Sequence, residues 1–461
     1  MFERISRVIL ISIPFLLSII SYSQGLGNSP YSSIGIGDVM NYTGNVRNMG
    51  MGNAGSAFFS KEYMNILNPA GIANLKYHRN DSLTKYEVGM TLQYKFLTNG
   101  QATSDSWGAN VKYLAYSFPV SKVYSTAISI TPLSSVQNYY SYTSSFPNAL
   151  NYMARYTYNG SGGIYQLQWA NGIGVTKNIS IGLATNFNFG TITQSSTTQL
   201  ITDPYNSYTE NTVGIQNKTN YSGLSFKPGI IFSKQFSNEN KNTEGKIGMP
   251  EKGIRFNFGA TVEFNSTINS KQTVYSFVQN TASLNLLDSA VSQTRAPAYL
   301  PSVYRIGIGL QKPNQWTLAA DLVVYNWSSY SKNQFNNDSY YAKSSFNLCV
   351  GAERQLTNQK RFTRSNTIRT GFMLSSTPLL INGETVYDYS FSIGGSLPVG
   401  VKKKEDDFTG RTARLPALNI ALVVGQRSSP GSIPGSLTET YYRLNVSMLI
   451  YQKWFNKRRI Q

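Results

Sequence analysis

From about residue 86 to near its end, the sequence alternates between apolar and polar residues with a period of two. In the first such segment Tyr86, Val88 and Met90 are apolar, whereas Glu87 and Gly89 between them are charged or small. Successive side chains of a β-strand point to opposite faces, so this segment would have one apolar and one polar face. A helical period of 3.6 residues is not sustained beyond the N-terminal segment. The pattern therefore predicts an all-β fold.

About fourteen segments carry this pattern, and each is roughly nine to fifteen residues long, as a tilted strand that crosses a membrane must be. Only 14% of the residues are charged, and the polar positions are mostly Gly, Ser, Thr and Asn. A soluble β-sandwich has shorter strands and a more highly charged wet face. We therefore predict a transmembrane antiparallel β-barrel of about 14 strands. The segments begin near Tyr86, Asn110, Thr126, Ile164, Ile179, Gly223, Ile254, Val303, Trp316, Phe346, Ile368, Tyr387, Leu418 and Tyr442.

The N-terminal segment has the features of a secretory signal peptide. Arg4 and Arg7 precede an apolar run from Val8 to Ile20, and small residues follow at Ser21 and Ser23. The run is shorter than the ~20 residues that a spanning helix needs. We expect residues 1–23 to be removed by cleavage near Ser23 and the mature chain to be exported.

The connections between the predicted strands alternate between short and long. Outer-membrane barrels have short periplasmic turns and long outer loops. This orientation predicts a barrel over residues 86–455, a periplasmic tail over 456–461, and both termini in the periplasm of an outer-membrane protein. The short links are 121–122, 176–178 and 312–315, and the long ones are 139–163, 201–219, 273–301 and 426–440.

The composition argues against several functions. The chain has one Cys and one His, so neither a disulfide framework nor a zinc site is expected. We predict no metal, no cofactor and no enzymatic activity. The net charge of +19 lies largely in predicted turns and tails rather than beside base-stacking aromatics. We therefore expect contact with anionic outer-membrane lipid and no binding of nucleic acid.

Residues 24–85 precede the barrel and lack its regular alternation. Small residues cluster at Gly50, Gly52 and Gly55, and Asn68-Pro69 has the composition of a turn. One interpretation is a flexible leader. The other is a compact plug in the lumen, which we favour because side chains of the wall alone cannot fill a barrel of about fourteen strands.

Two groups of motifs resemble those of the FadL-type outer-membrane transporters. The first is similar to the family's N-terminal hatch, and the second to a strand pair in the later half of its barrel. The resemblance implies a fourteen-stranded barrel whose hatch moves to admit hydrophobic molecules, which leave sideways through a gap in the third strand. The first group comprises Arg47 to Ala57, Asn65 to Leu67, and Asn68, Pro69, Ala70 and Gly71; the second comprises Leu300-Pro301, Tyr304 to Gly307, Trp316 to Asp321 and Asn326 to Ser328.

Two further features are candidates for a site. Pro132 interrupts the third predicted strand and lacks a backbone N–H, so it marks either a lateral opening or a strand end near the membrane surface. Several charged residues would point into the lumen, where they pair with each other or the plug, or bind a ligand headgroup. These are Glu87, Lys95, Arg255, Glu263, Arg305, Asp321, Glu353 and Arg443.

The resemblance leaves two functions open. The first is passive uptake of hydrophobic small molecules, such as fatty acids or hydrocarbons, by hatch movement and lateral exit. The alternative is a non-transporting barrel that serves as a shuttle, plug or scaffold subunit of an outer-membrane secretion or assembly complex. The expected partners are accordingly a hydrophobic ligand and membrane lipid, or the proteins of such a complex.

Overall fold

The computed structural model describes most of the region after the N-terminal segment. The predicted signal peptide and the predicted C-terminal tail lie outside the described residues. The described ranges are 25–58, 60, 63–75, 83–145, 153–201, 209–236, 253–279, 286–312, 315–330, 335, 341–357, 365–399, 416–428 and 437–453.

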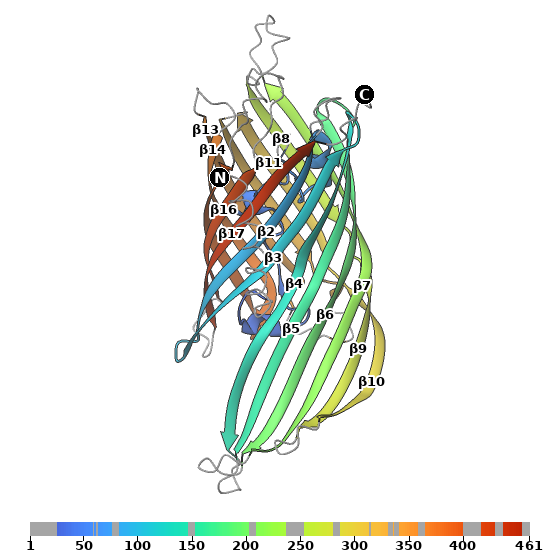
Figure 1. Ribbon diagram of the computed structural model, residues 1–461, viewed down its shortest axis with the longest axis vertical. Helices are drawn as coiled ribbons and strands as arrows, with labels where there is room; N and C mark the ends of the chain where they lie inside the picture. The colour runs from blue at the N-terminus through green and yellow to red at the C-terminus, as the bar shows by residue number, and fades with distance from the viewer. Residues whose placement is uncertain are drawn as a thin grey trace, which may run out of the picture.

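Strands β2–β17 form a closed wall in which neighbouring strands are antiparallel (Figure 1). The last strand returns to the first, since β17 pairs with β2 from Lys453–Leu83 to Thr438–Thr98. The strands are β2 (Leu83–Thr98), β3 (Thr103–Pro119), β4 (Tyr124–Ser145), β5 (Met153–Gly174), β6 (Ile179–Ile201), β7 (Thr209–Phe236), β8 (Ile254–Glu263), β9 (Thr267–Gln279), β10 (Leu286–Tyr299), β11 (Ser302–Lys312), β12 (Trp316–Asn326), β13 (Ser344–Thr357), β14 (Ser365–Ile381), β15 (Glu384–Pro398), β16 (Ala417–Ser428) and β17 (Thr438–Lys453).

Two positions in the wall hold a broken strand. β7 pairs with β9 along its first half and with β8 along its second half. β10 pairs with β9, and β11 pairs with β8. The pairs β8–β9 and β10–β11 therefore each occupy one position, which gives a barrel of 14 strands. This confirms the predicted fold, and each predicted segment lies in its own position of the wall.

The outer surface of the wall is apolar over one band and polar beyond it. Along β6 the outward residues change from Ile181, Leu183 and Phe187 to Thr191 and later Thr and Ser residues. The rings of Tyr165 and Phe189 lie 6.2 Å apart at this boundary, as expected where a barrel leaves the hydrocarbon region. Other exposed apolar residues of the band are Val88, Leu92, Leu114, Ile128, Leu167, Trp169, Leu224, Phe226, Ile230, Ile306, Ile308, Leu322, Val350, Phe372, Phe391 and Leu422.

Beyond the band, one side of the wall continues as a curved sheet, which projects below the rest of the barrel in Figure 1. We call this sheet the far extension; it consists of residues 134–145 of β4, 153–163 of β5, 190–201 of β6 and 209–223 of β7, with β9 and β10. The sequence predicted long loops at 139–163, 201–219 and 273–301, and this was wrong. The outward residues of these strands are mostly polar, and a few inward residues such as Val136, Ile192 and Tyr221 are buried, so the strands lack the apolar-outward alternation on which the prediction depended.

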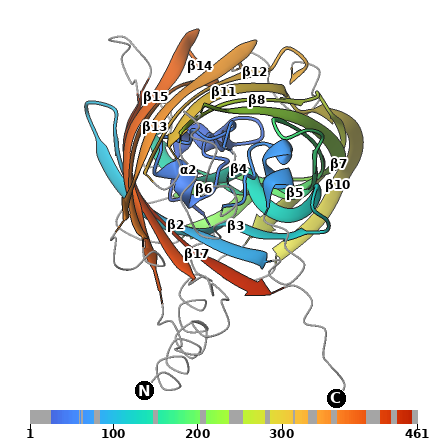
Figure 2. The ribbon, with the colours of Figure 1, turned by 90° about the horizontal axis from the view of Figure 1, so that it is seen from above.

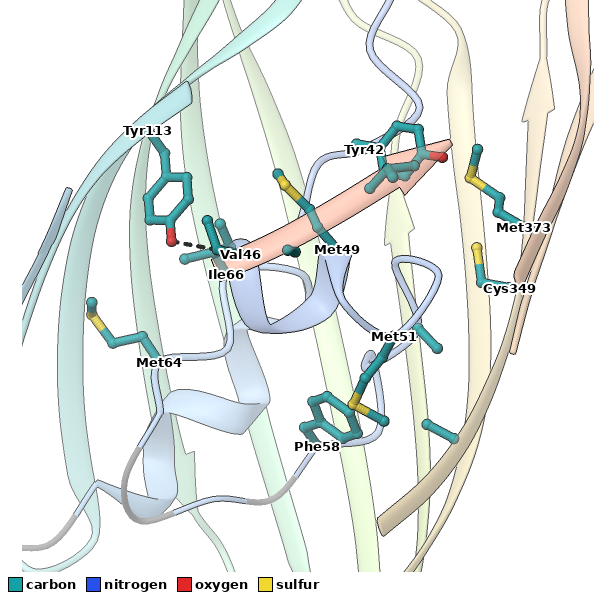
Figure 3. Close-up of a cluster of buried hydrophobic side chains, with 14 of the residues drawn as sticks. Tyr42, Val46, Met49, Met51, Phe58, Met64, Ile66, Tyr113, Cys349 and Met373 are labelled. Carbon is teal, nitrogen blue, oxygen red and sulfur yellow. Dashed lines mark hydrogen bonds between the residues drawn. The ribbon is translucent and has the colours of Figure 1, made fainter. Parts of the chain in front are cut away.

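The lumen holds the described residues from 25 to 75, which we call the plug (Figure 2). Its elements are short: η1 (Pro30–Ser33), β1 (Asp38–Val39), α2 (Val46–Met49) and η2 (Pro69–Asn74). Met49, Met51 and Phe58 pack against wall residues that include Cys349 and Met373 (Figure 3). The predicted plug is thus confirmed. No helix in the described part of the chain is long and apolar enough to cross a membrane.

The apolar band predicts that an arginine introduced within the band has a different effect on stability from one introduced beyond it. Leu92 is 47% exposed in the middle of β2, so Leu92→Arg should destabilise the folded barrel by about 2–4 kcal/mol. Asn159→Arg, at an exposed position of the far extension, should change stability by less than about 0.5 kcal/mol. Urea titration of protein refolded into vesicles measures both values. Equal effects at the two positions would contradict this placement of the membrane.

Candidate functional site

The glycine-rich part of the plug makes backbone contact with the wall. Asn45 caps α2, because its side-chain oxygen accepts a hydrogen bond from the N–H of Asn48 at 3.1 Å. Gly52 follows with φ of +63°, and a Cβ there would lie 2.4 Å from the backbone oxygen of Phe372 on β14. Only glycine combines this conformation with so close an approach. Gly50, just before it, lies beside Arg369 of the same strand.

The second plug motif docks on β6 and β7. The side-chain oxygen of Asn68 accepts from the N–H of Ala70 at 3.0 Å and so caps η2. The Asn68 amide also donates to the carbonyls of Ser56, at 3.0 Å, and Ile230 on β7, at 3.1 Å. Pro69, as the first residue of η2, has no N–H that would need a partner. Asn68 therefore links η2 and the segment at Ser56 to strand β7 of the wall.

Gly71 and the start of η2 lie in close contact with their surroundings. A Cβ on Gly71 would come within 2.8 Å of the Asn65 side chain, and one on Gly182 of β6 would lie 2.4 Å from the N–H nitrogen of Ala70. Gly182 thus lets the plug backbone approach the wall, whereas Gly71 lets two segments of the plug approach each other.

A buried ion-pair cluster joins the plug to β13 and β14. Arg47 of α2 donates to both carboxylate oxygens of Glu353, at 2.8 Å and 2.7 Å. Arg369 donates to the same carboxylate at 2.6 Å. The guanidinium of Arg47 also lies 4.3 Å from the ring centre of Phe58 and 4.4 Å from that of Tyr63. The predicted lumen residue Glu353 is therefore a plug anchor.

Asp321 on β12 forms a second anchor. One of its carboxylate oxygens accepts from the N–H groups of Gly55, at 3.0 Å, and Ser56, at 2.9 Å. The same oxygen lies 3.4 Å from the guanidinium of Arg305 on β11. Asp321 and Arg305, both predicted to face the lumen, thus meet at the turn that contains Gly55, which has φ of +146°.

Glu87 reaches the plug through a tyrosine. The Tyr113 hydroxyl donates to Glu87 at 2.7 Å and accepts from the N–H of Val46 at 3.1 Å, the second contact being drawn in Figure 3. Ser447 also donates to Glu87, at 2.8 Å. The carboxylate therefore fixes the tyrosine that receives the first N–H of α2.

A further anchor lies near the start of the plug, and the sequence predicted only Lys95 among its charged residues. Arg427 on β16 binds Asp38 of β1 at 2.9 Å and Asp388 of β15 at 3.4 Å. Glu439 on β17 accepts from the Ser29 hydroxyl at 2.7 Å and binds Lys95 at 3.0 Å. Asp388 occupies a polar position of the alternating pattern, and Arg427 is its register partner on the neighbouring strand β16.

Tyr31 of η1 contacts the same part of the wall. Burial raises the pKa of Tyr31 to about 12. Its hydroxyl therefore stays protonated at neutral pH and donates to the carbonyl of Leu437.

Three further predicted lumen charges remain. Arg443 donates to Gln93 of β2 at 2.7 Å, and its guanidinium lies 4.7 Å from the ring centre of Tyr42 in the plug. Glu263 and Arg255 bind side chains of the wall. Glu263 accepts from the side chains of Gln166, Asn186 and Ser225, all on the wall, at 2.8–2.9 Å. Arg255 lies near the start of β8 and donates to Gln235 at 3.0 Å at an exposed position.

The wall separates between β3 and β4, close to Pro132. These strands pair only from Leu114–Ile130 to Pro119–Ser125. Pro132 follows, with a register shift against β5 between it and Ser134. The rest of β4 has no β3 partner among the described residues, because the two strands diverge.

The start of the plug lies in this separation. Gly25 forms a bridge with Ala109 on β3. On the opposite side, the N–H of Ser29 donates to the carbonyl of Gln137 at 2.9 Å, and the N–H of Met40 donates to that of Leu133 at 3.0 Å. Strand β1 pairs with β4 at Val39–Ser134 and Asp38–Ser135. The plug backbone thus closes the wall where β3 and β4 part.

A small cavity lies behind Pro132. Its volume is about 70 Å³, and Met40 and Leu67 of the plug form one side of it. The wall side carries the charged groups of Lys227, Glu263 and Arg305. Apolar residues such as Val39, Ile66 and Leu133 also line this space, so its lining is mixed, and its volume is far below the about 300–1,000 Å³ of a typical small-molecule pocket. Elsewhere among the described residues, no group of three or more Asp, Glu, His or Cys side chains is arranged to hold a metal.

The anchors predict that loss of one buried carboxylate weakens the binding of the plug to the wall. Glu353→Gln leaves Arg47 and Arg369 buried without their carboxylate, so the free energy that holds the plug in the barrel should fall by about 3–5 kcal/mol. The matched control Glu384→Gln changes an exposed carboxylate at the start of β15. Protease cleavage between residues 25 and 75, scored on barrels that keep their folded gel mobility, should accelerate only in Glu353→Gln. Equal cleavage rates would exclude the anchor role.

Comparisons with known proteins agree with this architecture. The sequence profile of the BamG family matches residues 4–461. A Pseudomonas aeruginosa FadL homologue has a TM-score of 0.55 and 13% identity, covering 91% of this chain and 100% of its own. The CymD monoaromatic hydrocarbon channel has a TM-score of 0.53 and 11% identity, covering 92% of this chain and 100% of its own.

The Ralstonia pickettii toluene transporter TbuX gives a similar result, with a TM-score of 0.50 and 12% identity over 89% of this chain and 98% of its own. No curated protein matches the sequence. At these identities the solved structures establish the fold alone, whereas the profile covers nearly the whole chain. The chain therefore belongs to the BamG family, and its fold is that of the FadL-type outer-membrane barrels.

Proposed function

We propose that this outer-membrane barrel is a non-transporting scaffold subunit of an outer-membrane assembly complex. The observation that carries the proposal is that the plug closes the separation between β3 and β4 and leaves a small cavity there. The plug backbone pairs across this separation, and the cavity behind Pro132 measures about 70 Å³ and carries three charged groups. Pockets for small molecules are usually apolar and measure about 300–1,000 Å³. A lateral path for apolar molecules has no such pocket at this place.

Two further features support a scaffold. The plug is held by buried ion pairs of Arg47 with Glu353 and of Asp38 with Arg427, and by the hydrogen bonds of two plug N–H groups to Asp321. Releasing it would remove one partner each from Glu353, Asp321 and Arg427, which keep a second partner on the wall, and each lost hydrogen bond to a charged group costs about 1.5–3 kcal/mol. The family name is also compatible with partners in an assembly complex. The periplasmic side is then the end at which β2 begins, and the far extension lies outside the cell.

A second candidate function is passive uptake of a hydrophobic molecule. It is favoured by the divergence of β3 and β4 beside Pro132, since a wall without hydrogen bonds between strands can open there. Solved structures with this fold include channels described as carrying monoaromatic hydrocarbons or toluene. In this function, residues 25–40 would have to leave the separation to admit the molecule.

Locking the plug to the wall distinguishes the two functions. Val39 and Ser134 are register partners of β1 and β4, so Val39→Cys with Ser134→Cys places two thiols at disulfide distance. The native Cys349 is buried and does not compete. In a deletion strain, the oxidised variant should restore the abundance of other outer-membrane barrels as well as wild type does. Val39→Cys alone is the control.

The opposite result has a clear meaning. If the oxidised variant fails and a reductant restores the barrel abundance, the plug must move and a static scaffold is excluded. If deletion of the protein itself leaves the barrel abundance unchanged, the uptake function replaces the scaffold. Purification of the wild-type protein in mild detergent gives an independent check. Equimolar partner proteins support the scaffold, whereas a solitary barrel with a stoichiometric apolar ligand contradicts it.

A further inference from the structure

The far extension has one strand edge that the barrel leaves unpaired. Beyond Tyr139, β4 pairs with β5 on one side, from Tyr140–Tyr158 to Ser145–Met153. On its other side, the described residues provide no partner strand. All seven residues from Tyr139 to Ser145 are exposed.

The direction of the free backbone groups follows from the contacts of the plug. Gln137 and Tyr139 direct both N–H and C=O toward the plug: Gln137 bonds to Ser32 and Ser29, and Tyr139 bonds to Asn28. In an antiparallel sheet, alternate residues direct these groups to the same side. Ser141, Thr143 and Ser145 therefore present their N–H and C=O groups along the open edge.

This edge lacks the features that usually protect a free strand. Residues 139–145 read YYSYTSS, with no Lys, no Pro and no other charged residue. The register shift in β4 lies earlier, at Pro132. Edge strands commonly carry a charge, a proline or a bulge that prevents pairing with another chain. An edge that lacks these features and lies outside the apolar band can therefore pair with a strand of another chain.

Tyrosines line the concave face beside this edge. Tyr140 stacks on Tyr158 with ring centres 5.0 Å apart, and Tyr142 stacks on Tyr156 at 5.1 Å. Tyr142 is 52% exposed. The stack offers contact area to alternate side chains of an added strand, and exposed tyrosines are enriched at protein interfaces.

We propose that the edge of β4 from Tyr139 to Ser145 binds an extended segment of a second protein, which adds to the far extension as a further strand. The chain already uses this mode on the adjoining part of the edge, where β1 and residues 28–29 pair with residues 133–139. The partner segment continues that added strand outside the membrane. Its backbone binds Ser141, Thr143 and Ser145, and its apolar or aromatic side chains contact Tyr140 and Tyr142.

This inference rests on the proposed scaffold function and names the mode by which the subunit holds a partner. The test uses the full-length tagged protein purified from its own outer membranes in mild detergent. Thr143→Pro removes one edge N–H and leaves the pairing with β5 intact, because proline is tolerated on the open side of an edge strand. Thr143→Val keeps the N–H and is the matched control. Heat-modifiable gel mobility verifies that both variants fold.

The expected result is a loss of one co-purifying protein by about tenfold or more in Thr143→Pro, with wild-type amounts in Thr143→Val. A photo-cross-linking residue in place of Ser141 should join the barrel to one contiguous segment of that same protein, as mapped by mass spectrometry.

Three results would overturn the inference. Cross-links solely to a second copy of this chain would make the edge a homodimer contact. Wild-type amounts of partner in Thr143→Pro, with no cross-link from position 141, would place the partner elsewhere and leave the scaffold function standing. A wild-type barrel that purifies without any equimolar partner removes both the inference and the scaffold function.

Discussion

The structure depends on one constraint, which is that backbone groups within a bilayer must find their hydrogen-bond partners inside the protein. Pairing of β17 with β2 satisfies it at the seam, over the whole length of both strands. Between β3 and β4 the wall does not satisfy it alone. The plug backbone pairs with Ala109 of β3 and Leu133 of β4, and it continues beyond the band at Ser134 and Ser135. The plug is therefore part of the wall as well as the content of the lumen.

The contact between the plug and the wall also explains how charge is distributed. The outer surface of the band is apolar, so the charged residues of the strands lie inward, where burial would be costly without partners. Arg47, Asp38 and the N–H groups near Gly55 supply those partners from the plug. Each anchor joins the plug to a different set of strands, so the interaction holds its orientation as well as its position.

The sequence predicted the membrane-crossing strands well because lipid on one side and a polar lumen on the other impose a period of two on residues such as Ile181, Leu183 and Phe187. It did not predict the far extension, where outward residues such as Thr191 and Ser195 are polar and face water instead of lipid. The cluster of Gly50, Gly52 and Gly55 indicated a plug. The ion pair of Arg427 with Asp38 could not be predicted, because its members are 389 residues apart and only the closed ring brings them together.

The seam also determines the order in which the protein assembles. Ser29, near the start of the described chain, donates to Glu439 on the last strand, 410 residues later. Contacts of such sequence separation form slowly and late. The strand that completes the ring thus also binds the plug, so the N-terminal segment must already be inside when the ring closes. Biogenesis of this barrel is a wrapping of the wall around its own N-terminal segment rather than the filling of a finished pore.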